Sequence, residues 1–177
     1  MACPLALGMT RDCSDSTGGV QEILISERDN ITAFTQANME VSAITQFATT
    51  KFYRYELKKE VGSLTSTITI DPAKGTSFYD NVVAFTINKM TAAKSNELRL
   101  MILGRLVVLA KDGNGVWWSL GLQGASGSEG FAEGTSLVGQ TGTAFGDANS
   151  YDISISDKQK DSPFVVESSV VAGLDIV

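Results

Sequence analysis

The fold is decided by the stretch LVVLAKDGNGVWWSLGL (Leu106–Leu122), which contains two sheet-forming runs on either side of a turn signal. The turn reads Asp112-Gly-Asn-Gly115, and these residue types tolerate the positive φ that a short hairpin loop requires. Because side chains alternate across a strand, the two tryptophans face opposite ways. Trp118 shares a face with Leu120 and Leu122, and Trp117 shares the other with Ser119 and Gly121. We expect Trp118 in the core of the domain and Trp117 exposed or nearer an interface.

Much of the remaining sequence alternates with a period of two, which is typical of half-buried strands. Three runs show this pattern: Leu64, Ser66, Ile68 and Ile70 against Thr65, Thr67 and Thr69; Val83, Phe85 and Ile87 against Ala84, Thr86 and Asn88; and Tyr151, Ile153 and Ile155 against Asp152, Ser154 and Ser156. Less regular strands are expected at Gln21–Glu27, Met39–Phe47 and Phe52–Glu60. The chain is therefore predicted to be mainly β.

One segment departs from the strand pattern and predicts a helix over about residues 91–103. Its apolar residues, including Leu98 and Met101, recur at helical spacing, and Thr91 or Ser95 would cap its N-terminus. Gly104 stands where a C-terminal cap belongs. We expect this helix to pack against a sheet or to cover the end of a barrel.

A glycine-rich loop is expected at about residues 123–149, which read QGASGSEGFAEGTSLVGQTGTAFGDAN. A structureless stretch of this length is unusual inside a compact domain and is usually functional or disordered. Its isolated apolar residues suggest two readings: a loop that orders against a neighbouring subunit, or a loose insertion. These residues are Phe131, Leu137, Val138 and Phe145.

The composition argues against catalysis and against metal binding. The chain has 177 residues, no histidine and a formal net charge of −6. Without histidine, Ser-His and Cys-His catalysis and histidine-metal sites are excluded, and Cys3 and Cys13 are too few to hold zinc alone. The acidic residues are scattered along the chain. We therefore expect no enzyme activity, no metal and no cofactor.

The charge and hydropathy also restrict the partners. A pI near 4.6 disfavours the clustered lysines and arginines with which proteins hold nucleic-acid phosphates. No run approaches the roughly 20 apolar residues of a membrane span, so no membrane partner is expected. The N-terminus lacks the basic region of a signal peptide, which favours reduced thiols at Cys3 and Cys13.

Several segments follow one another in an order that carries a family resemblance: YRYEL at 53–57, KEVGSLTSTITI at 59–70, GTSFY at 75–79 and KMTAAK at 89–94. The helix, the DGNG hairpin and the glycine-rich stretch that leads to FGDANSYDISI at 145–155 continue it. In this order the chain resembles the tail tube proteins of tailed bacteriophages, most closely those of phages of Bacteroidetes-type hosts. The resemblance covers roughly residues 10–157, and the chain departs from it after Ile155.

The resemblance implies a β-sandwich or half-barrel with one flanking helix. It divides the chain into an N-terminal arm at 1–17, a tail tube domain at 18–157, and a C-terminal strand or arm at 158–177. Six subunits would form a ring whose strands close one large β-barrel. Stacked rings would form the tube that conducts DNA from the capsid to the host cell, in the tail of a virion assembled in the bacterial cytoplasm.

The partners implied are further copies of the chain, the tape-measure protein, the tail terminator and the baseplate or tail-tip proteins. A contractile tail would add a sheath protein. DNA would pass without sequence-specific binding, because an acidic wall repels phosphates. Candidate lumen-facing acids are Glu56, Glu60 and Asp71, and the Thr65/Thr67/Thr69 and Ala84/Thr86/Asn88 faces are candidate walls. Candidate subunit contacts are Trp117, Phe131, Leu137, Val138 and Phe145.

Three other functions stay open on the sequence. A head–tail connector or tail terminator would share the fold but cap a tube instead of polymerising. A secretion-system tube protein of the Hcp type is also a hexameric ring. A small carbohydrate-binding β-domain would use Trp117 as a platform for a sugar ring.

Overall fold

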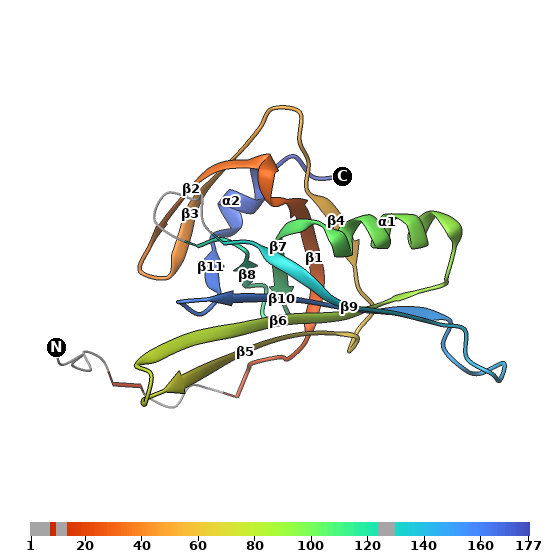
Figure 1. The fold of residues 1–177 in the computed structure, drawn as a ribbon. Helices are drawn as coiled ribbons and strands as arrows, with labels where there is room; N and C mark the ends of the chain where they lie inside the picture. The colour runs from red at the N-terminus through yellow and green to blue at the C-terminus, as the bar shows by residue number, and fades with distance from the viewer. Residues whose placement is uncertain (1–7, 10–13, 124–129) are drawn as a thin grey trace.

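The computed structural model describes residues 8–9, 14–123 and 130–177. Strands hold 54% of the residues and helices 12%, which confirms that the protein is mainly β. The strands form one open mixed sheet, and α1 (Ala92–Leu103) and the short α2 (Ser168–Ala172) pack against it (Figure 1). The described strands are β1 (Val20–Glu27), β2 (Ile31–Ala37), β3 (Glu40–Gln46), β4 (Tyr53–Glu56), β5 (Gly62–Asp71), β6 (Thr76–Asn88), β7 (Arg105–Asp112), β8 (Trp117–Leu120), β9 (Ala132–Gln140), β10 (Ser150–Gln159) and β11 (Phe164–Val166), with a 3-10 turn, η1 (Arg28–Asn30), between β1 and β2.

The sheet is organised around β7, which is hydrogen-bonded along both edges. One edge pairs with β1, and the other pairs with β8 over Val108–Lys111 and with β9 at Arg105 and Leu106. From this branch the order runs β8-β11-β3-β2 in one direction and β9-β10-β6-β5 in the other, while β4 pairs with β1. The predicted turn joins β7 to β8, and its Asp112 carboxylate accepts from the backbone N–H groups of Asn114 and Val116.

The uninterrupted apolar run of β7 is explained by burial on both faces, as expected for a central strand. Alternate residues enter two different cores. The first core contains Leu106, Val108 and Ala110 of β7 with Ile23 and Ile25 of β1, and reaches to β6, β10 and α1. The second core contains Val107 and Leu109 with Leu24, and reaches to β2, β3, β8 and β11. β1 and β7 therefore each contribute side chains to both cores.

The expectation for the two tryptophans is wrong. Trp117 is the buried one, 6% exposed in the second core, whereas Trp118 is half-buried. Trp118 does share a face with Leu120, but it lies beyond the edge of the first core, and its Nε1 donates to Asp112 Oδ2 at 3.1 Å. Leu120 packs in the first core but Leu122 packs in the second. The alternation is broken between them because Gly121 adopts φ +81°. A Cβ at Gly121 would lie 2.4 Å from the carbonyl oxygen of Leu106.

The predicted helix is confirmed as α1, and it covers one side of a four-stranded sheet of β9, β10, β6 and β5. The Thr91 hydroxyl caps its N-terminus by accepting from the backbone N–H of Lys94, and Gly104 stands at its C-terminal cap. Leu98 and Met101 enter the first core. Val83, Phe85, Ile153 and Ile155 are buried beneath them, which confirms the alternation predicted for β6 and β10.

The stretch expected as a loop at 123–149 contains strand β9, so this expectation is wrong for residues 132–140; residues 124–129 lie outside the described part. β9 pairs along its length with β10. Its glycines serve close packing: a Cβ at Gly134 would lie 2.3 Å from Ile102 Cδ1 of α1, and one at Gly139 would lie 3.0 Å from Met90 Cε. Glycine richness here reflects a helix that packs tightly on a strand, which composition alone reads as a loop.

The segment after Ile155 is part of the fold. β10 continues to Gln159, and β11 then inserts between β8 and β3, antiparallel to the first and parallel to the second. Phe164 and Val166 of β11 and Val171 of α2 are buried in the second core. Of the expected N-terminal arm, residues 1–7 and 10–13, with both cysteines, lie outside the described residues.

We predict that Gly134→Ala destabilises the fold by about 1–3 kcal/mol, because overpacking forces helix and strand apart. The added Cβ would meet not only the Ile102 side chain but also its Cα, at 2.9 Å, so a rotamer change cannot relieve the clash. The matched control is Gly146→Ala, where no atom lies within 4 Å of the new Cβ. Urea denaturation monitored by tryptophan fluorescence measures both; equal stability of the two variants would contradict the packing argument.

Candidate assembly surface

One face of the four-stranded sheet is polar and has neither helix over it. We call it the polar face: the side of β9-β10-β6-β5 turned away from the first core and α1 (Figure 1). The pairing registers place the following residues on it: Ser63, Thr65, Thr67 and Thr69 of β5; Phe78, Asp80, Val82, Ala84 and Thr86 of β6; Asp152, Ser154, Ser156 and Lys158 of β10; and Glu133, Ser136 and Val138 of β9. The threonine and serine rows come from strands far apart in the sequence.

The polar face has a negative balance of charge. It carries Asp80, Glu133 and Asp152 against Lys158. Asp152 is held in place by two donors, because the Thr86 hydroxyl and Gln140 Nε2 each reach it at 2.8 Å. Lys158 lies 5.8 Å from the centre of the Phe78 ring, a cation–π distance. A phosphate chain approaching this face meets a field of its own sign.

The four-stranded sheet also has two open edges. Among the described strands β5 pairs only with β6, and β9 pairs with β7 only at Glu133 and Ala132. Gly134–Gln140 and the outer side of β5 therefore have no strand partner among the described residues. Such edges are templates for pairing with another chain. Because each neighbouring pair in β5-β6-β10-β9 is antiparallel, β5 and β9 also run in opposite directions.

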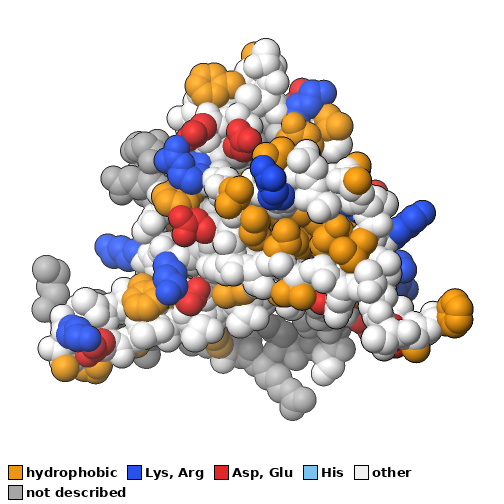
Figure 2. All heavy atoms as spheres, turned by 45° about the vertical axis from the view of Figure 1, so that its right-hand side comes forward, with side chains coloured by type: hydrophobic (Ala, Val, Ile, Leu, Met, Phe, Trp, Pro, Cys, Tyr) orange, Lys and Arg blue, Asp and Glu red, His pale blue; other side chains and the backbone are white. Residues whose placement is uncertain are grey.

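The outer half of β5 carries apolar residues that nothing described covers. Ile68 is 46% and Ile70 is 62% exposed, although they share a face with Leu64, which packs on the first core. The sequence predicted a half-buried strand here, and burial ends near Ser66 because the β5–β6 hairpin projects beyond the core (Figure 1). Figure 2 shows further hydrophobic side chains on the side that carries α1, where Tyr53, Leu100 and Leu103 are exposed. Exposed apolar groups of this kind mark contact surfaces.

The five predicted contact residues are not brought together. Trp117 is buried, and Leu137 packs partly against the first core. Val138, 51% exposed, lies on the polar face opposite Asp152. The Arg105 Cζ atom lies over the Phe131 ring, 5.7 Å from the ring centre. Phe145 stands fully exposed in the β9–β10 turn.

The three predicted lumen acids are also dispersed. Asp71 ends β5, where Oδ1 accepts from the backbone N–H groups of Ala73 and Lys74 and Oδ2 lies 3.2 Å from Lys74 Nζ. This carboxylate therefore shapes the β5–β6 turn. Glu60 precedes the other end of β5 with φ +64°, and Glu56 ends β4, outside the four-stranded sheet. The acids of the polar face are different ones.

A buried polar group was missed by the sequence reading, because alternation gives the face of a residue and not what covers it. Asn81, Asp157 and Gln159 are each at most 2% exposed, beside the first core. Ser66 Oγ donates to Asn81 Oδ1 at 2.6 Å, and the Gly121 N–H donates to Asp157 Oδ2 at 2.8 Å. Burial raises the pKa of Asp157 to about 6; the Gly121 hydrogen bond acts in the opposite direction and nearby Asp80 adds to the rise.

We predict that Asp157 makes the folded protein less stable as the pH rises from about 4 to about 6. In this window the unfolded chain has released the proton and the folded chain keeps it, so folding loses up to about 3 kcal/mol. Asp157→Asn keeps an acceptor for the Gly121 N–H and removes the charge. Urea denaturation from pH 4 to pH 7 should show the variant gaining about that amount relative to the wild type. A difference independent of pH would refute the buried acid.

Within residues 14–123 and 130–177, no three cysteine, aspartate or glutamate side chains lie close enough to hold a metal ion. Neither described helix is long and apolar enough to cross a membrane. The described surface has open clefts, among them one of about 350 Å³ beside Trp118 and one of about 270 Å³ between α1 and β4.

The chain matches no protein-family model, no curated protein and no solved structure.

Proposed function

We propose that this chain is a structural subunit that self-assembles head to tail into rings and stacked tubes, as its resemblance to phage tail tube proteins implies. The observation that carries the proposal is the four-stranded sheet with two open, oppositely directed edges and one polar face. In a monomer such a sheet leaves backbone N–H and C=O groups unpaired along both edges, and edges of this kind tend to pair with another chain. Closure into a ring removes both edges at once.

The edges are compatible with a rotational ring. If β9 of one subunit lies beside β5 of the next, the two strands are antiparallel and the four-strand pattern continues without interruption. The contact is heterologous, since a different edge is used on each side, and such contacts close into rings when the rotation fits. Six subunits would supply about 24 strands, more than the 16–18 strands with which porins enclose an aqueous channel.

In this ring the polar face lines the bore. Its hydroxyl rows, Thr65, Thr67 and Thr69 with Ser154 and Ser156, give a wettable wall, and its carboxylates keep phosphates from adhering. The first core and α1 then lie outside the barrel. The passing cargo is the tape-measure protein and afterwards genomic DNA, without sequence-specific contacts.

The remaining assignments follow from the same proposal. The protein would be a component of the virion tail, not an enzyme, and would contact the tail terminator and the baseplate or tail-tip proteins at the ends of the tube. The exposed apolar side chains beside α1 would face a neighbouring ring or a sheath. A connector or an Hcp-type secretion tube would use the same edges and stays the alternative. A sugar platform at Trp117 is contradicted by its burial.

Purified protein should form hollow tubes with a regular ring repeat in negative-stain electron micrographs. Amide hydrogen exchange should show that assembly protects β5 and β9, where outward N–H groups find partners. The matched control is β2, which also pairs on one side only among the described strands and should gain no protection. Isolated rings would favour a connector, and a strict monomer at high concentration would rule out every ring-based function.

We further predict that reversing the charge of the polar face makes the tube bind DNA. Glu133 and Ser156 lie directly opposite each other, so the double variant Glu133→Lys, Ser156→Lys places two cations together. The control is Glu40→Lys, Ser42→Lys on the exposed surface of β3. Assembled tubes of the first variant should retain an oligonucleotide at low salt, release it as salt rises, and shield it from nuclease. Equal nuclease sensitivity in both variants would place the polar face outside the bore.

A further inference from the structure

The β9–β10 turn presents an aromatic side chain to solvent on an ordered support. Phe145 is fully exposed, and its turn is built around Asp147, whose Oδ2 accepts from the N–H groups of Thr143 at 2.7 Å and Ala144 at 2.8 Å and from the Thr143 hydroxyl. These bonds hold the pKa of Asp147 below its usual range. Because the turn is already ordered, docking it would cost little conformational entropy. A pre-ordered exposed aromatic is typical of an interface anchor.

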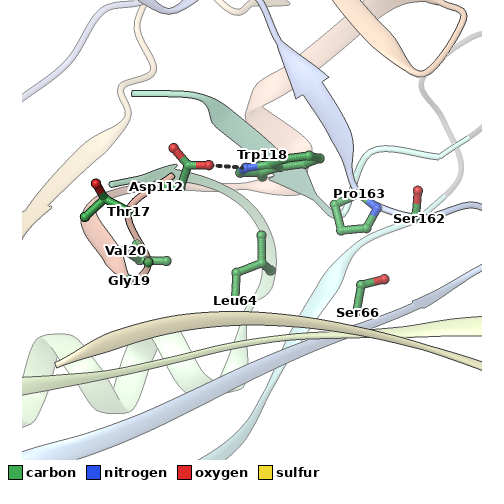
Figure 3. Close-up of a pocket in the computed structure, with 10 residues that line it drawn as sticks. Thr17, Gly19, Val20, Leu64, Ser66, Asp112, Trp118, Ser162 and Pro163 are labelled. Atoms are coloured by element: carbon green, nitrogen blue, oxygen red, sulfur yellow. Dashed lines mark hydrogen bonds between the residues drawn. The ribbon is translucent and has the colours of Figure 1, made fainter. Parts of the chain in front are cut away.

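An apolar cleft lies near the other end of the same sheet. Its walls are Val20 and Leu64 on one side and Trp118 and Pro163 on the other, with Ser66 and Ser162 at its polar points. Figure 3 shows the Trp118 indole lying across from Leu64 and Ser66, and the bond to Asp112 fixes the ring. The volume is about 350 Å³, and a cavity of about 150 Å³ already admits benzene. The exposed Ile68 and Ile70 extend this surface along β5.

We propose that the cleft beside Trp118 receives the Phe145 turn of a second copy of this chain. A copy cannot fill its own cleft. Ser66, in the cleft, lies in register with Asn81 and through it with Asp157 of β10. Asp157 is seven residues from Ser150, which stands at the base of the turn, so the cleft and the turn are roughly 23 Å apart along the strand. The contact therefore joins unlike ends of two copies and propagates head to tail. It rests on the proposed function only in requiring self-assembly.

The charges around the two ends are complementary at the base of the turn and the rim of the cleft, while the turn itself carries Asp147 and the rim also carries Lys160. The turn rises from a base with Lys89, whose N–H donates to the Asn149 carbonyl oxygen, and Lys94, whose Nζ donates to the Asn88 carbonyl oxygen. The cleft is flanked by Asp15 and Asp112, and Asp161 precedes Ser162. Opposite signs steer the encounter. Asp147 and Asp112 are already satisfied by hydrogen bonds, so burying either would leave no unpaired carboxylate.

The test uses two full-length proteins in which Cys3 and Cys13 are replaced by serine. One carries Ala144→Cys, an exposed position next to the intact Phe145, and the other carries Ile68→Cys on β5 beside the cleft. Mild oxidation of the mixture should give one covalent dimer, because a disulfide requires Cα atoms within about 7 Å. Absence of that dimer, or an equal yield from either protein alone, would overturn the proposal.

A second measurement separates this contact from the tube itself. Phe145→Ala should weaken self-association at least tenfold in analytical ultracentrifugation, while Phe47→Ala, at a phenylalanine 54% exposed elsewhere, should leave it unchanged. If both variants assemble like the wild type, the Phe145 contact is wrong and the tube proposal stands. If the mixed cysteine proteins cross-link but micrographs show no tubes, the contact stands and the tube proposal fails.

Discussion

The structure depends on β7 being hydrogen-bonded along both edges and buried on both faces. Its partners on one side are β1 and on the other β8 and β9, so it is the point at which the sheet divides. Its alternate residues supply two cores at once, and β1 does the same beside it. A polar substitution at any position of Val107–Ala110 would therefore bury a polar group in one of the two cores and destabilise the fold.

The division at β7 leaves the four-stranded sheet incompletely paired. Among the described strands, β9 pairs with β7 only through its first two residues, and the rest of β9 and the outer side of β5 have no strand partner. The first core and α1 cover one face, so the hydroxyl rows and carboxylates collect on the other. Open edges and a polar face are thus consequences of a single topological choice, and they are the features from which a ring with a hydrophilic bore can be built.

The contacts proposed between copies use different kinds of interaction for different tasks. Backbone pairing of β5 with β9 is repetitive and has little register specificity by itself. An aromatic anchor in a cleft is local and fixes position. Together they would combine closure of a ring with a defined offset between subunits. Asp157, buried beside Ser66 and Asn81 under the same region, would make the stability of this support depend on pH.

The sequence by itself determined the elements whose signals are local. Alternation located β6 and β10, residue chemistry located the DGNG turn, and Thr91 and Gly104 bounded α1, because propensity and capping act within a few residues. Only the tertiary structure decided which tryptophan is buried, why the glycines of β9 belong to a strand, and where burial ends on β5. Alternation gives each side chain a direction, whereas burial depends on which distant segments cover that direction. For the same reason the open edges and the hydrogen-bonded support of Phe145 became visible only in the folded chain, whereas the threonine row of the polar face was already expected from the sequence.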